Sequence, residues 1–215
     1  MKDRIFIFDM DGVLVDTVKQ LYSVYHDFIC SFSKEVDSAD LTKLNGLKLA
    51  QIITFAKTKY EIPGTEEELI KQYSTLVSNI YLEAPLIDNV ETVLKKIKDD
   101  GFKIALASSA KIDQINPVLK RFNLKEYFEF ITSGDDVIRG KPFPDIYNLI
   151  RDHFGDNKYY VIEDSANGII AADDAGMNVI FFNRENEKYN PTARYMITSM
   201  DQFNTILGQI KKDER

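Results

Sequence analysis

The feature that most constrains the fold is an alternation, along the second half of the chain, of short apolar runs with segments of helical period. Val90, Val93, Leu94 and Ile97 recur with helical spacing, and Asp88 and Glu91 have the spacing of a helix N-cap and N3 pair. Strands are predicted at residues 4–8, 102–107, 130–132, 159–162 and 179–182, and helices from 88 and near 112–122, 145–154 and 168–174. Repeated βα units of this kind predict an α/β fold, a doubly wound parallel sheet with helices on both faces.

One stretch interrupts this alternation. Residues 16–82 contain no strand-like run, but they contain helical patterns such as Leu21, Val24, Tyr25 and Phe28. We therefore predict a core domain formed by 1–15 and 83–215, with a small helical cap domain, 16–82, inserted after the first strand. The segment Glu83-Ala84-Pro85 marks the cap's exit, where the proline restricts the backbone.

Composition excludes several classes of partner. The 215 residues, 44% of them hydrophobic, carry 27 basic and 34 acidic side chains, a net charge of -7. Such an acidic surface disfavours nucleic acid and anionic lipid, so we expect no nucleic-acid partner and no membrane association. Cys30 is the single cysteine, which fits a reducing compartment. We expect a cytoplasmic protein and a monomer.

Polar side chains follow the ends of the predicted strands. In doubly wound sheets, ligands bind beyond the carboxyl ends of the strands, so these positions are the first candidates for a site. They are Asp9 and Asp11 after the first strand, Ser108 and Ser109 after the second, Lys141 in the loop after the third, and Glu163 and Asp164 after the fourth.

The charges of these residues predict bound cations. If the strand ends converge, each close pair of carboxylates costs about 4 kcal/mol at an effective dielectric near 20. A hard, oxygen-liganded Mg²⁺ and the ammonium of Lys141 would offset that repulsion and would also neutralise phosphate oxygens. We expect Asp164 to be the closer metal ligand, with Glu163 acting directly or through water.

Each signal has a plainer explanation when taken alone. Asp-x-Asp after a strand is common in turns, and Ser108 with Ser109 can cap the following helix. Lys141 can be a solvated loop lysine, and an acidic pair at a helix entry is favoured by the helix dipole. Four such signals at successive strand ends, with complementary charges, favour a phosphoryl-transfer site.

The segments FDMDGVLVDT, LASS, GKPFPD and VIEDSANGIIAADDAGM resemble, in content and order, the four motifs of the haloacid dehalogenase-like superfamily. The resemblance extends over residues 1–182 and is greatest to the subgroup with a small helical cap, which includes β-phosphoglucomutase and phosphoglycolate phosphatase. It implies a Rossmann-like core and a phosphatase that removes phosphate from a small phosphorylated metabolite, a sugar phosphate or similar, through an aspartyl-phosphate intermediate.

The resemblance also implies the roles of individual residues. Asp9 would be the nucleophile and Asp11 the general acid/base, which separates this chain from true dehalogenases. Ser108, with Ser109 beside it, and Lys141 would hold the phosphoryl group. Asp9, the main-chain carbonyl of Asp11, and Asp164 with Glu163 nearby would bind Mg²⁺.

A phosphosugar mutase is the nearest alternative. Mutases of this subgroup carry a histidine shortly after the first motif and an arginine just after a cap glycine. Here the corresponding residues are Leu21 and, after Gly46, the run Leu47-Lys48-Leu49, so hydrolysis is favoured. Among the cap lysines, Lys19, Lys43 and Lys48 are candidates for substrate contact, although charged cap residues are usually solvated.

A phospho-receiver signalling module is an alternative from another class. It is also doubly wound and also uses a phosphoacceptor aspartate, Mg²⁺, a hydroxyl and a lysine. Receivers place the phosphoacceptor after the third strand and lack a helical insertion, whereas the acidic pair here follows the first strand. The order of the motifs therefore favours the enzyme.

Overall fold

The computed structural model describes residues 3–184 and 193–213, and its centre is a parallel sheet of order β3-β2-β1-β4-β5-β6. The strands are β1 (Arg4–Phe8), β2 (Lys103–Ala107), β3 (Phe130–Thr132), β4 (Lys158–Glu163), β5 (Asn178–Phe182) and β6 (Tyr195–Ile197). The predicted doubly wound parallel sheet is confirmed, and β6 is a strand that the sequence pattern did not reveal.

An apolar cluster lies on each face of the sheet. Strand β1 contributes to both clusters, because its successive side chains point to opposite faces. Phe6 and Phe8 of β1 belong to one buried cluster, whereas Ile5 and Ile7 belong to the other. The first face is covered by α5 (Val90–Asp99), α6 (Ile112–Arg121) and α9 (Phe203–Asp213), and the second by α7 (Asp145–Phe154) and α8 (Ala166–Asp174). Burial on both sides explains why these strands read as continuous apolar runs.

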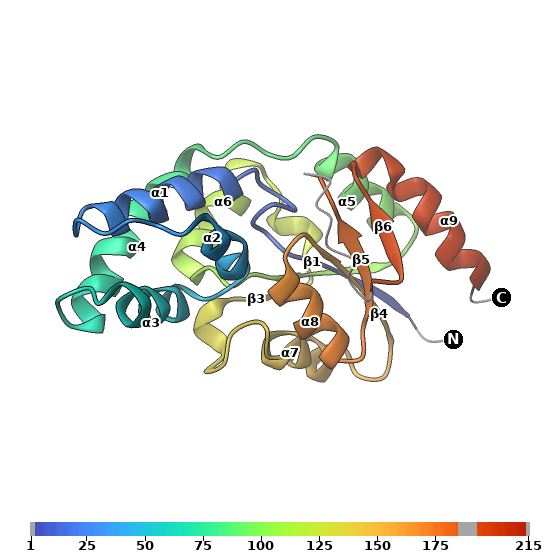
Figure 1. Cartoon of the computed structure of the whole chain (residues 1–215). Helices are drawn as coiled ribbons and strands as arrows, with labels where there is room; N and C mark the ends of the chain where they lie inside the picture. Colours follow the sequence, from blue (N-terminus) through green and yellow to red (C-terminus); the bar gives the residue numbers. More distant parts are fainter. Residues whose placement is uncertain (1–2, 185–192, 214–215) are drawn as a thin grey trace.

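The helical insertion after β1 is confirmed, and it lies beyond the carboxyl ends of the strands (Figure 1). Its helices are α1 (Val18–Cys30), α2 (Ser38–Leu44), α3 (Leu49–Tyr60) and α4 (Glu66–Glu83). Aromatic side chains fill its interior, and the ring centroids of Phe28 and Tyr73 lie 5.1 Å apart. Within the described residues, no helix has the length and apolar character needed to cross a membrane.

The two segments that join the insertion to the sheet run side by side. Asp16 N donates to Pro85 O at 3.0 Å, and Ile87 N donates to Leu14 O at 2.9 Å. From α6, the guanidinium of Arg121 donates to carbonyl oxygens of the returning segment. Both connections therefore form one narrow, hydrogen-bonded neck.

The N-cap residue predicted for α5 is wrong by one position. The helix begins at Val90, and its N-cap is Asn89, not Asp88. Asn89 has a φ of 64°, a left-handed conformation that asparagine tolerates better than most residues. Its amide donates to Asp201 at 2.7 Å, so a contact far away in the sequence accompanies this helix start.

Candidate active site

The register of the sheet brings three strand ends together. Phe8 pairs with Leu106 of β2 and with Ile162 of β4, so Asp9 lies level with Ala107 and Glu163. All of these strands are parallel, and their carboxyl ends therefore share one edge, which faces the helical insertion (Figure 1).

Lys141 is the centre of the site. Its ammonium donates to Asp9 Oδ1 at 2.6 Å, to Ala107 O at 3.2 Å and to Glu163 Oε1, which uses all three of its donors. The side chain is completely buried. Burial alone would lower the lysine pKa, but the carboxylates of Asp9 and Glu163 together raise the pKa well above its usual value. Lys141 is therefore a fixed positive charge.

Glu163 is held by partners on both of its oxygens. Tyr147 donates its hydroxyl to Oε1 at 2.9 Å. Oε2 accepts from the backbone N–H groups of Asp164 and Ser165 at 3.1 and 3.2 Å and from the Ser165 hydroxyl at 3.0 Å. A side chain so fully bonded keeps Lys141 in place.

The residues fit a divalent cation. Carboxylate oxygens of Asp9, Glu163 and Asp164 lie within 4.8 Å of one another. Asp164 Oδ2 accepts from Asn45 at 3.3 Å, whereas the buried Oδ1 has no hydrogen-bond partner. Burial, followed by the charges of Glu163 and Asp9, raises the Asp164 pKa well above its usual value. An orphaned oxygen in an electronegative cluster is what a hard cation such as Mg²⁺ requires.

Close packing around Asp164 explains a glycine in the first motif. Gly12 has a φ of +76°, and a Cβ there would collide with the Asp164 carboxylate. The glycine therefore permits both the turn after β1 and the close approach of that acid.

The side chain of Asp11 is not part of the acidic cluster formed by Asp9, Glu163 and Asp164. Thr17 donates to its Oδ1 at 2.6 Å, and Tyr81 of α4 donates to its Oδ2 at 3.1 Å. Burial raises the pKa of Asp11, and the two hydrogen bonds only partly offset that effect. The Asp11 carboxyl is therefore oriented by the helical insertion. Its raised pKa is the direction of shift that a general acid needs.

The two serines after β2 point in different directions. Buried Ser108 accepts from Ala110 N at 3.1 Å through its hydroxyl, which keeps its own proton to donate. Ser109 instead donates to the carbonyl of Gly46 in the insertion at 2.6 Å. Its hydroxyl therefore links the sheet domain to the insertion. A place for Ser109 beside the phosphoryl group stays a prediction.

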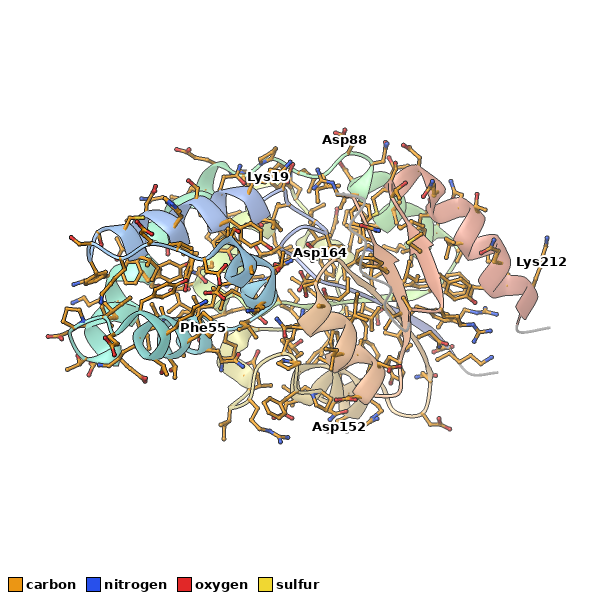
Figure 2. All side chains as sticks on the ribbon, in the orientation of Figure 1. Lys19, Phe55, Asp88, Asp152, Asp164 and Lys212 are labelled. Carbon is orange, nitrogen blue, oxygen red and sulfur yellow. The ribbon has the colours of Figure 1, made fainter. Side chains whose placement is uncertain are left out.

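A pocket opens between the strand ends and the insertion. Asp9, Asp11 and Ser109 line its floor, and side chains of α1–α4 form its walls. Figure 2 places Asp164 at the same junction. The cap lysines lie elsewhere: Lys43 contacts Asp40, Lys48 donates to Val137 O, and Lys19 lines a neighbouring pocket.

Several site residues lay beyond the reach of sequence reasoning. Tyr81, Asn45 and Tyr147 orient carboxylates from distant parts of the chain. Thr17, which orients Asp11, is the last residue of the first motif and could have been noticed there. The other three carry no local signal, since an isolated tyrosine or asparagine in a helix or loop is ordinary.

Comparisons with known proteins agree with this geometry. The sequence model of the haloacid dehalogenase-like hydrolases matches residues 6–182. A "phosphorylated carbohydrates phosphatase" of Thermotoga maritima is 31% identical over 179 residues, covering 81% of this chain and 82% of that protein. "Hexitol phosphatase B" of Escherichia coli is 26% identical over 179 residues, with 81% of each protein covered.

Solved structures show the same fold. A β-phosphoglucomutase from Clostridium difficile superposes with a TM-score of 0.82 at 24% identity, covering 99% of this chain and 98% of that one. In this chain the acidic cluster and the buried lysine lie at the carboxyl edge of the parallel sheet, under the helical insertion. This chain belongs to the haloacid dehalogenase-like hydrolases. Within them it is a phosphatase.

Proposed function

We propose that this phosphatase hydrolyses a small phosphorylated metabolite with Mg²⁺ as cofactor and a covalent phosphate on Asp9. The observation that carries the proposal is that Asp9 and Asp11 line the same pocket, while the buried Lys141 is bonded to Asp9. A nucleophile, a proton donor and a fixed cation thus meet at one end of a cavity.

The chemistry takes two in-line steps. An oxygen of Asp9 attacks phosphorus, the ester P–O bond breaks, and Asp11 donates its proton to the departing alcohol oxygen. Water then attacks the aspartyl phosphate, Asp11 accepts a proton from that water, and the P–O bond to Asp9 breaks to release phosphate. Hydrogen bonds from Thr17 and Tyr81 keep the Asp11 carboxyl in position for both transfers.

Positive charge and hydrogen-bond donors stabilise the transferred group. Lys141 and the free proton of the Ser108 hydroxyl would hold phosphate oxygens, with Ser109 beside them. Asp9, the main-chain carbonyl of Asp11, and Asp164 would hold Mg²⁺, with Glu163 near it. When bound, the cation supplies charge neutralisation of the phosphate and of the clustered carboxylates.

The helical insertion would act as a cap on this site. We place it at residues 16–82, with the core formed by 1–15 and 83–215. The narrow neck formed by the two connecting segments supports a hinge. Hydrogen bonds from Asn45, Ser109 and Tyr81 between the insertion and the rest of the chain support a closed position. Closure would exclude water during the first step, and opening would admit it for the second.

A phosphosugar mutase remains the second candidate, since a solved relative with this fold is named β-phosphoglucomutase. A mutase must grip a second phosphate on its substrate. Leu21, Leu47 and Leu49 line the pocket at the positions that correspond to the histidine and arginine of the mutases. These apolar side chains support hydrolysis instead.

The proposal is tested by metal-dependent turnover of p-nitrophenyl phosphate. Activity should disappear in excess chelator and return when Mg²⁺ is added in excess over the chelator. A parallel assay supplied with glucose 1-phosphate and a sugar bisphosphate primer should form no glucose 6-phosphate. Full activity in chelator would contradict the metal role, and efficient isomerisation would favour the mutase.

A further inference from the structure

The walls of the pocket beyond Asp9 and Asp11 are mostly apolar, with Asn45, Ser109 and Gln114 as the polar side chains other than tyrosine among the lining residues. Aliphatic side chains from α1–α4 and the loops between them face it, together with aromatic rings of α1 and α4. The apolar residues are Leu21, Leu41, Leu44, Leu47, Leu49, Ile52 and Val77, and the tyrosines are Tyr22, Tyr25, Tyr73 and Tyr81.

Among the described residues that line this pocket, Asp9 and Asp11 are the charged ones, and no lysine, arginine or histidine is present. The nearest cationic candidates are engaged elsewhere. Lys48 donates to the carbonyl of Val137 at 2.5 Å, and Lys141 lies buried behind Asp9. A second anionic group on the substrate would therefore sit beside two carboxylates without a counter-ion.

A neighbouring pocket offers cations but lies in the wrong place. Lys19 and Arg184 line it together with Asp164, whereas Asp9 and Asp11 do not. The alcohol that leaves phosphorus must be within reach of the Asp11 carboxyl. It therefore occupies the apolar pocket.

Two residues that line the pocket each carry a buried polar atom without a partner. The side chains of Tyr25 and Gln114 are only 2% and 4% exposed, yet the tyrosine hydroxyl and the glutamine Nε2 make no hydrogen bond. The other end of the Gln114 amide is fixed, because its Oε1 accepts from Lys111 N at 3.0 Å. Buried unpaired polar groups are costly, and a ligand group that bonds to them relieves that cost.

From these observations we infer that the substrate is a phosphate monoester of an uncharged alcohol with a mostly apolar carbon skeleton and few hydrogen-bonding groups. The inference rests on the proposed function and assigns the substrate class of the same site. Bisphosphates, phosphorylated acids and fully hydroxylated polyol phosphates are outside that class.

A matched pair of esters tests the charge requirement on the wild-type enzyme with Mg²⁺. 4-Carbamoylphenyl phosphate and 4-carboxyphenyl phosphate have nearly the same shape and differ in one negative charge. We expect kcat/KM to favour the neutral ester by about 10²-fold or more, because the extra carboxylate enters an apolar pocket unpaired. Equal values, or preference for the carboxylate, would overturn the inference.

Placing a cation in the pocket should weaken that preference. Leu41 and Ile52 line the pocket and are partly exposed, so Leu41→Lys and Ile52→Lys are the test variants. Leu76→Lys is the matched control, since Leu76 is 44% exposed and is not among the lining residues. The neutral-to-anionic ratio should fall about tenfold or more in the folded test variants and stay unchanged in the control. An unchanged ratio in both would contradict the placement.

The apolar requirement has its own comparison. Benzyl phosphate should be hydrolysed with a kcat/KM about tenfold or more above that of a hexitol phosphate, whose hydroxyls would lose water without finding partners. The reverse order would overturn the assignment of an apolar alcohol. Failure to turn over any of these esters or p-nitrophenyl phosphate would instead contradict the proposed function itself.

Discussion

Among the described residues, two clusters are built from the same kinds of group, one in the cap around the buried Asp40 and one at the candidate catalytic edge. In the cap cluster, Asp40 accepts from Lys43, Lys59 and Tyr60, the last two at 2.5 and 2.7 Å. The catalytic cluster comprises Asp9, Lys141, Glu163 and Asp164. Both bury carboxylates and place an ammonium against them.

The carboxyl pKa values of the two clusters are shifted in opposite directions. Burial acts to raise the pKa of Asp40, but hydrogen bonds from Lys59, Tyr60 and Lys43 together lower it. The pKa values of Asp9 and Asp164 are instead raised well above the usual value, with burial as the largest cause. In the cap cluster donors outnumber the acid, whereas three carboxylates share one ammonium at the catalytic edge. The satisfied cluster stabilises structure, whereas the excess of carboxylates at the other favours binding of a cation.

The largest effect should separate the clusters by function. Asp9→Asn removes the proposed nucleophile, so turnover of p-nitrophenyl phosphate and labelling of the protein by substrate phosphate should both be lost. Asp40→Asn makes the same chemical change in the cap cluster and should keep activity within about threefold of wild type at temperatures where the variant is folded, since Asp40 lies outside the pocket. Labelling that persists in Asp9→Asn would exclude this aspartate as nucleophile.

The next effect separates the two aspartates of the first motif. Nitrophenolate needs little protonation to leave, so Asp11→Asn should complete the first step and stall before the second. General acid/base assistance is worth about 10²- to 10⁴-fold, and the aspartyl phosphate should outlive its normal lifetime by a comparable factor. Rapid mixing should show a burst near one equivalent of nitrophenolate and then slow turnover. A burst in Asp9→Asn and none in Asp11→Asn would reverse the roles.

Removing each lysine should compare the clusters by stability. Lys141→Met leaves the Asp9 and Glu163 carboxylates buried without their cation, and it should lower the free energy of unfolding by about 3–5 kcal/mol. The Lys59 side chain is 34% exposed, so Lys59→Met should cost about 1 kcal/mol or less. Urea denaturation of both variants without Mg²⁺ measures the difference. Equal losses would show that burial does not distinguish the two clusters.

The smallest predicted effect has opposite signs in the two clusters. Asp40→Asn should lower the free energy of unfolding by about 1–3 kcal/mol, because the charge-assisted bonds from Lys59 and Lys43 are lost. Asp164→Asn removes one unpaired negative charge and places an amide donor near neighbouring carboxylates. In chelator it should raise stability by about 1 kcal/mol. Thermal melts should also show a smaller stabilisation of Asp164→Asn by Mg²⁺. Destabilisation in chelator would mean that Asp164 is not strained in the metal-free protein.

Much of the architecture is local information and was predictable. The strands are buried on both faces, so their apolar runs stand out, and β3 was predicted at its observed bounds. Because parallel strands align their carboxyl ends, the sequence is enough to place the polar residues that follow them at one edge. β6 (Tyr195–Ile197) is as short as β3, and the sequence pattern did not reveal it.

What the sequence by itself determined is the sheet, the helical insertion and the set of candidate residues at the strand ends. Tertiary structure alone decided how they are used. It turned Ser109 toward Gly46, brought Tyr81 to Asp11, and left Asp164 with an unpaired oxygen. The reason is physical: strand and helix patterns repeat over a few residues, whereas hydrogen-bond partners and pocket walls come from segments dozens of residues apart, which only packing brings together.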